Sequence, residues 1–168
     1  MRSSYLVGFV VGLALAVTAA QAETLEFSAH LTGRGEVPSN DSGGKGDVDV
    51  QVDSDTHVLT YKAAYKGLSG PATMAHFHGP AKGGATAPPV IAVDDPSSPI
   101  SGRASVTDAQ IAELKKGLWY FNVHTAAYPD GEIRGQLKRE VDWAAEDSPT
   151  GMPDISGERR MPASIGSR

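Results

Sequence analysis

Apolar and polar residues alternate along several short stretches of the chain. Between Thr24 and Leu31 every second residue is apolar, and the stretches 46–52 and 58–65 show the same period of two. This period is typical of a β-strand that has one buried face. The polar residues 53–56 separate the second and third stretches and predict a turn, so we expect these two strands to form an antiparallel hairpin.

The same reasoning predicts further strands later in the chain. They are separated by stretches rich in Gly, Pro, Ala and Ser, which we expect to form loops at 79–89 and 94–101. The predicted strands are 72–78, 90–93, 118–125 and 132–138, and the last two form a final hairpin around 126–131.

One stretch, 107–116, has a helical pattern instead. Ile111 and Leu114 lie on one side of it, Thr107 can cap its N-terminus, and Gln110 stands three residues later as in a capping box. Many short strands divided by turn residues, with one short helix, predict an all-β fold. We expect an antiparallel β-sandwich or barrel with one short α-helix.

The first 22 residues differ from the rest of the chain. They combine a positively charged start, a short apolar run over 6–17 and a small-residue site before Glu23. This is the pattern of a cleaved signal peptide, and the apolar run is shorter than the roughly 20 residues of a membrane-spanning helix. We therefore expect an exported protein, periplasmic or secreted, with no membrane span after the signal peptide at 1–22 is cleaved.

The remaining residues divide into two parts. The alternating pattern fills 23–140, which we expect to form one β domain. Residues 141–168 are rich in Pro, Gly, Ser and charge and have no periodicity, so they predict a disordered tail.

Composition narrows the chemistry that the chain can perform. The net charge of −5 without a basic run argues against nucleic acid as a partner. The chain contains no cysteine, which excludes disulfides and thiolate ligands, so imidazole, carboxylate or backbone oxygen must hold any metal. Imidazole ligands suit copper or zinc. The sequence also lacks a nucleophile-elbow motif, a phosphate-binding loop and EF-hand spacing.

Three histidines are the candidate metal ligands. In an extended strand His76 and His78 point to the same side, and His124 lies near the end of a later strand, on the same face as Asn122. If the two strands are neighbours, the three imidazoles can converge on copper or zinc. The alternative is that these histidines only make hydrogen bonds that fix loops at strand ends.

A second group of polar residues surrounds the last predicted strand. Glu132, Arg134 and Gln136 share a strand face by alternation, and Glu36 follows the first strand. A Glu–Arg pair between the first and last strands would fasten the sheet, which we favour because charged groups on strands usually pair. The alternative is a polar pocket for an acidic or sugar ligand.

Three stretches together resemble the CHRD domain, a module named after chordin and found in exported microbial proteins. They are "FSAHLTGRGEVP" (27–38), "MAHFHGPA" (74–81) and "LWYFNVHTAAYPDGEIRGQL" (118–137), and the predicted helix "TDAQIAELKKG" precedes the third as in the family. The chain departs from the family in having Ser39 where a second proline is common. The resemblance implies that 23–140 is an extracytoplasmic β-rich module, and it supplies no catalytic residues.

These observations leave three functional hypotheses. The first is a non-enzymatic extracytoplasmic binding or structural module, whose partner is an unknown protein, glycan or metal ligand. The second is a periplasmic or secreted copper- or zinc-binding protein that uses the three histidines. The third, which we favour least, is a redox or hydrolytic metalloenzyme on the same site.

Overall fold

The computed structural model describes residues 23–140, and the predicted signal peptide and tail lie outside this range. The described residues form nine strands, one α-helix and one turn of 3-10 helix. No helix among them is long and apolar enough to span a membrane. The strands are β1 (Thr24–Thr32), β2 (Lys45–Asp53), β3 (Val58–Lys66), β4 (Ala72–His78), β5 (Pro89–Ala92), β6 (Ile100–Ser105), β7 (Tyr120–Thr125), β8 (Ile133–Gln136) and β9 (Lys138–Arg139); the 3-10 turn η1 is Gly33–Gly35 and the helix α1 is Asp108–Lys115.

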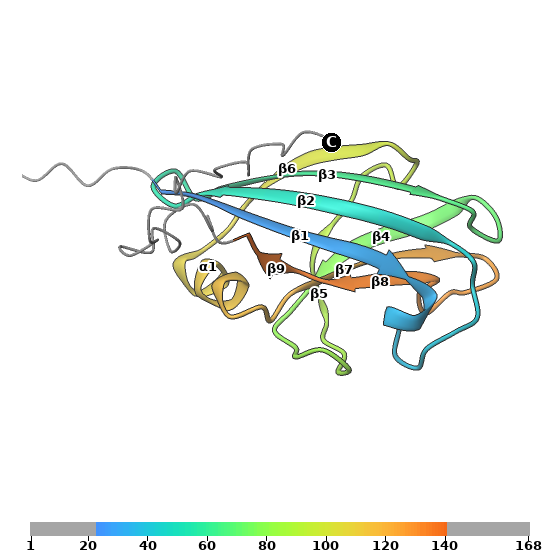
Figure 1. Ribbon diagram of the computed structural model, residues 1–168. Coiled ribbons are helices and arrows are strands. Elements are labelled where there is room, and N and C mark those ends of the chain that lie inside the picture. Colours follow the sequence, from blue (N-terminus) through green and yellow to red (C-terminus); the bar gives the residue numbers. More distant parts are fainter. Residues whose placement is uncertain (1–22, 141–168) are drawn as a thin grey trace, which may run out of the picture.

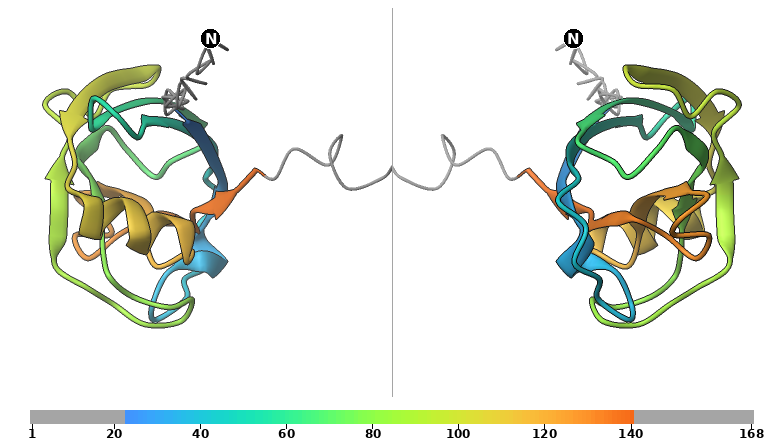
Figure 2. Two further views of the ribbon diagram at one scale, coloured as in Figure 1. Left: turned by 90° about the vertical axis from the view of Figure 1, so that its left-hand side faces the viewer. Right: turned by 90° about the vertical axis from the view of Figure 1, so that its right-hand side faces the viewer.

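The strands form one antiparallel sheet that curls into a nearly closed barrel (Figures 1 and 2). Their order is β5-β4-β7-β8-β1-β2-β3-β6, and β9 pairs with β1 beside β8. The rings of Tyr61 on β3 and Phe77 on β4 meet edge to face, with centroids 5.0 Å apart. Since these strands are far apart in the sheet order, this contact shows that the two ends of the sheet approach each other. The all-β prediction with a single short helix is therefore confirmed for the described residues, and the sheet is barrel-like.

The core of the barrel follows from the alternating pattern. Inward residues of β1 and β2 stand opposite each other, for example Phe27 and Val50, and both are about fully buried. The predicted hairpin of β2 and β3 is confirmed, with continuous pairing from the turn onwards. β7 differs because all six of its residues are buried, so neither of its faces is open to solvent. Its outward face is covered by a loop, which matters for the candidate site.

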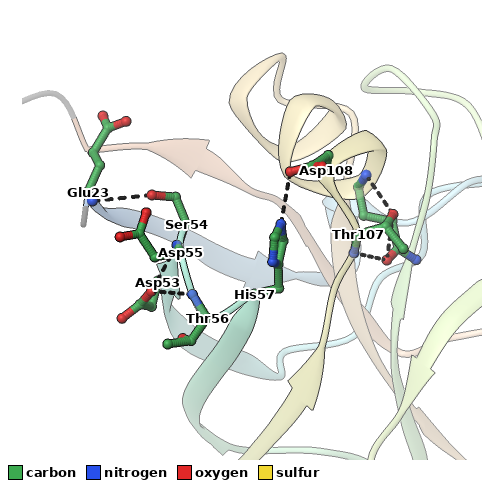
Figure 3. A network of polar contacts seen from close by, with 9 residues as sticks. Glu23, Asp53, Ser54, Asp55, Thr56, His57, Thr107 and Asp108 are labelled. Atoms are coloured by element: carbon green, nitrogen blue, oxygen red, sulfur yellow. Dashed lines mark hydrogen bonds and ion pairs between the residues drawn. The ribbon is translucent and has the colours of Figure 1, made fainter. Parts of the chain in front are cut away.

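The helix covers one end of the barrel, as Figure 1 shows. Thr107 and Gln110 form the predicted capping box, and Ile111 and Leu114 are the buried residues that close the core. In Figure 3, His57 at the β2–β3 turn joins this helix through a 2.8 Å contact between its Nε2 and the Asp108 carboxylate. This end of the molecule is therefore held by local polar contacts between the turn and the start of the helix.

One strand was not predicted from the pattern. Residues 94–101 were expected to be a loop, but β6 begins at Ile100 and pairs antiparallel with β3. Gly102 faces Tyr61 in this pair, and a Cβ at Gly102 would lie 2.3 Å from the Tyr61 hydroxyl. The Tyr61 side chain on β3 fills the space that a side chain at position 102 of β6 would need. This position of β6 is therefore a glycine, and the alternation of apolar residues along β6 is weak.

The last predicted strand, 132–138, is divided in two. β8 pairs with β7 to form the expected final hairpin, whereas β9 pairs with β1. Leu137 lies between them, fully buried, and its backbone N–H donates to the carbonyl of Trp119.

Candidate metal site

The outer face of β4 and β7 carries a row of polar and aromatic side chains. The register places His76 opposite Asn122 and His78 opposite Tyr120. Phe77, between the two histidines, points into the core and packs on Phe121. Directly opposite residues of an antiparallel pair have their side chains on the same face, so alternation and register together gather these polar groups.

A loop of residues 79–88, named here the covering loop, lies over this face. Its backbone carbonyls accept hydrogen bonds from side chains of the sheet: Arg134 donates to Ala85 at 2.7 Å, and Gln136 donates to Ala81 at 2.9 Å. The Tyr120 hydroxyl lies 3.2 Å from both the N–H and the carbonyl of Ala87. These contacts hold the loop in place and explain why the outward residues of β7 are buried.

The three histidines predicted as ligands come together under this loop and the loop after β7. The Nδ1 atom of His76 lies 3.2 Å from the Nε2 atom of His124. One ring nitrogen from each of His76, His78 and His124 lies within 4.8 Å of the others. His78 and His124 are 8% and 6% exposed, while His76 is half-buried and reaches solvent.

Backbone carbonyls determine which nitrogen of two rings is free. His78 directs its Nδ1 to the carbonyl of Ala87, and His124 directs its Nδ1 to the carbonyl of Pro129, both at 2.9 Å. Since a carbonyl can only accept, each Nδ1 carries a proton, and in a neutral ring the Nε2 atom then has a free lone pair. In metal-binding histidines, the ring nitrogen that does not bind the metal typically donates a hydrogen bond, for example to a backbone carbonyl.

The two free nitrogens face the same neighbour. The Oδ1 atom of Asn122 lies 3.0 Å from Nε2 of His78 and 3.1 Å from Nε2 of His124. An amide oxygen has no proton to donate, so three acceptor atoms converge at this point when the rings are neutral, and of these the Nε2 atom of His124 can also accept a hydrogen bond from Nδ1 of His76, 3.2 Å away. A bound cation would satisfy all three acceptors.

The surroundings of His76 and His78 favour the neutral form of these two imidazoles. Burial lowers the pKa of His76, and the neighbouring His124 and His78 lower it further. Burial also lowers the pKa of His78, although its hydrogen bonds to Ala87 and Asn122 oppose this effect. Neutral rings are the form that binds a metal.

The distances can be compared with those of a metal centre. With metal–nitrogen bonds of about 2.0–2.1 Å in tetrahedral geometry, two ligand nitrogens lie about 3.3 Å apart. The His76–His124 pair, at 3.2 Å, has this spacing already. The three nitrogens all lie within 4.8 Å of one another, which is the upper limit for the spacing of the other two pairs. The donor set, three imidazoles, is one that copper and zinc accept, and one of its nitrogen pairs has the spacing of two ligands.

The remaining two histidines of the chain, His30 and His57, lie outside the three-histidine group. His30 pairs with Asp47 across β1 and β2, and His57 contacts Asp108 near the helix. Both side chains are well exposed, and neither belongs to the three-histidine group.

The predicted Glu–Arg pair takes a different form. The Arg134 guanidinium lies flat over the Tyr120 ring, 3.4 Å from its centroid, and makes its hydrogen bond to the covering loop. Glu36 is buried nearby, and its Oε1 has no hydrogen-bond partner. Burial raises the pKa of Glu36 to about 7, although Arg134, the Val37 backbone and the Asn122 side chain act in the opposite direction. The two residues are neighbours without forming a direct salt bridge.

Glu132 belongs to a separate polar cluster at the end of the barrel opposite the helix. Its fully buried carboxylate accepts hydrogen bonds from the hydroxyls of Ser42, Ser69 and Thr125 and from the Ser69 backbone N–H, at 2.6–2.7 Å. Although burial raises its pKa, the bonds from Ser69, Thr125 and Ser42 outweigh burial and keep the pKa of Glu132 below its ordinary value. This cluster joins three loops and is structural.

Sequence reasoning did not find the groups that orient the histidines. The carbonyls of Ala87 and Pro129 belong to loops, and nothing in their residue types signals a hydrogen bond to an imidazole. Asn122 was placed on the correct face by alternation, but its position between two ring nitrogens depends on the pairing of β4 with β7.

Comparison with known proteins gives one match. The family model described as CHRD domain matches residues 27–137, which is more than half of the chain. This range includes β1 to β8 with the helix, and all three histidines, apart from the first residues of β1. No curated protein and no solved structure matches the chain.

Proposed function

The chain belongs to the CHRD domain family, and we propose that it is a non-enzymatic extracytoplasmic module that binds copper or zinc through His76, His78 and His124. The observation that carries this proposal is the orientation of the rings. Two of them donate their Nδ1 protons to backbone carbonyls, which directs their Nε2 lone pairs toward the same place. Hydrogen bonds that only fixed the loops would not require the three rings to converge.

Burial favours a binding role over a catalytic one. A catalytic metal keeps an open coordination position for substrate or water. Here His78 and His124 are almost completely buried, and Asn122 packs against both of their free nitrogens. Of the three candidate ligands, only His76 is part-exposed, so two of the three imidazoles are shielded from solvent.

The N-terminal sequence supports export. Residues 1–22 have the charge, apolar run and cleavage site of a signal peptide. A site built from imidazoles also suits an oxidising compartment, because it contains no thiol. Secretion of the full chain by a bacterial host should yield a mature protein whose N-terminal residue is Glu23, as read by mass spectrometry.

Calorimetric titration of the metal-free protein with copper(II) and with zinc(II) tests the metal site. We expect binding of one ion per chain, which His76→Ala and His124→Ala each weaken by about a hundredfold or more. His30→Ala is the matched control, because His30 is also a strand histidine with a polar partner but lies outside the group. It should bind both metals as the wild type does.

His76→Ala is the more informative variant, because His76 is half-buried and its loss leaves the core intact. Circular dichroism should confirm that each variant is folded. Unchanged metal affinity in folded His76→Ala and His124→Ala proteins, or no binding by the wild type, refutes the metal site and leaves a structural role for the histidines.

A further inference from the structure

The face that carries the three histidines also carries a thioether. In the segment Met74 to His78, alternation places Ala75 and Phe77 in the core, where both are fully buried. Met74 and His76 are therefore on the outer face, with His78. The histidine pair is thus the continuation of a row that begins with a methionine.

Met74 stands directly opposite a candidate ligand. The register of β4 and β7 pairs Met74 with His124. Cβ atoms of directly opposite residues lie about 4.5–5.5 Å apart, and methionine has three rotatable bonds beyond its Cα. The Met74 sulfur can therefore reach the His76–His124 pair, whose nitrogens are 3.2 Å apart.

Met74 is exposed, which leaves its side chain free to turn toward the imidazoles. Among the described residues, Met74 is the large apolar side chain that is exposed, at 44%. Its side chain is not fixed in the core, so its three rotatable bonds can turn the sulfur toward the imidazoles. His76, the half-buried histidine, is the next residue after Met74 on the outer face of β4.

From this placement we infer that the site takes copper(I), with the Met74 thioether as a ligand in addition to the histidine nitrogens. The inference rests on the proposed metal site and adds the chemical class of the ion. A thioether is a soft ligand that selects copper(I), whereas zinc(II) is satisfied by imidazole alone. The chain has no cysteine, so methionine is its only source of a sulfur ligand.

The test compares copper(I) with zinc(II) in the full chain. Copper(I) affinity is measured anaerobically by competition with a chromophoric copper(I) chelator, and zinc(II) affinity by calorimetry. Met74→Leu, which keeps the apolar volume, should weaken copper(I) binding by about tenfold or more and change zinc(II) binding by less than about twofold. His76→Ala should weaken the binding of both ions.

The other methionines of the mature chain provide a matched control. Met152 and Met161 lie outside the described residues, and replacing both by leucine should leave copper(I) affinity unchanged. X-ray absorption of the copper(I)-loaded wild type should show a sulfur scatterer, which Met74→Leu removes and the double variant keeps.

Two failures are distinguishable. If the wild type binds neither ion, or if His76→Ala binds both normally, the metal site itself is wrong. If His76→Ala loses both ions while Met74→Leu keeps full copper(I) affinity and the sulfur signal is absent, only the thioether ligand is wrong. Loss of copper(I) in the Met152 and Met161 double variant also overturns the assignment to Met74.

Discussion

Glu36 should make the stability of the metal-free protein fall as the pH rises. Its side chain is almost completely buried, and its Oε1 has no hydrogen-bond partner. Gly131 packs directly on it, since a Cβ at that position would lie 2.4 Å from Oε1. Burial is the main reason that the pKa of Glu36 rises from 4.5 to about 7 in the folded protein.

The sign of the effect follows from the two pKa values. The folded state binds the Glu36 proton more tightly than the unfolded state, in which the pKa returns to 4.5. The contribution of this group to the free energy of unfolding is therefore fully present below about pH 4.5 and is lost as the pH rises through about 7. At about 1.4 kcal/mol per unit of pKa difference, the complete loss is about 3.4 kcal/mol.

The accessible part of this loss can be measured with Glu36→Gln. Between about pH 5 and about pH 8.5 the two pKa values give a loss of about 2.5 kcal/mol, and relaxation of the site around the charge reduces it to about 1–2 kcal/mol. Glutamine stays neutral at both pH values, so the variant does not suffer this loss. The free energy of unfolding of Glu36→Gln minus that of the wild type should therefore be about 1–2 kcal/mol larger at the higher pH than at the lower pH.

Urea unfolding followed by tryptophan fluorescence, at both pH values and with chelator present, measures this difference. His76 and His78 also make the protein less stable in acid because their pKa values are lowered in the folded state, but they do so in both proteins, so their contributions cancel in the comparison. Glu26→Gln, on the exposed side of β1, makes the same carboxylate-to-amide change outside the core and is the matched control. Parallel pH profiles for the wild type and Glu36→Gln would show that Glu36 titrates normally and would refute the reasoning.

Two further predictions concern stability. Glu132→Ala removes a buried carboxylate that accepts four hydrogen bonds. In urea titrations it should lower the free energy of unfolding by about 3–5 kcal/mol. Glu26→Ala, at an exposed strand position, should lower it by less than about 0.5 kcal/mol. Equal losses in the two variants would contradict the structural role of the Glu132 cluster. Gly79→Ala places a Cβ 2.4 Å from the buried Trp119 ring. It should lower the free energy of unfolding by about 1–3 kcal/mol and change the tryptophan fluorescence. Gly83→Ala, where the space is open, should behave as the wild type. A normal melting temperature for Gly79→Ala would show that the ring moves aside freely.

The sequence by itself determined the elements that depend on local information. A period of two needs only neighbouring residues to be recognised, so the strands of the first hairpin were found with nearly correct bounds. The helix was found because its cap is a local hydrogen-bond pattern between Thr107 and Gln110. The grouping of His76 and His78 on one face likewise follows from alternation within one strand.

Only the tertiary structure decided what these elements meet. Alternation does not give strand order, so the closure of the sheet into a barrel depends on contacts such as Tyr61 with Phe77. β6 was missed because Tyr61 occupies the space over Gly102 and removes the need for an apolar residue there.

In the candidate site, too, the sequence determined the residue types and the tertiary structure determined their arrangement. His76 and His124 are 48 residues apart in the chain, and the register of β4 with β7 sets their nitrogens 3.2 Å apart. The carbonyls that orient His78 and His124 come from loops, whose conformation no periodic pattern encodes. The residue types could therefore propose the ligands, but pairing between distant strands and the loops packed over them decided whether the lone pairs converge.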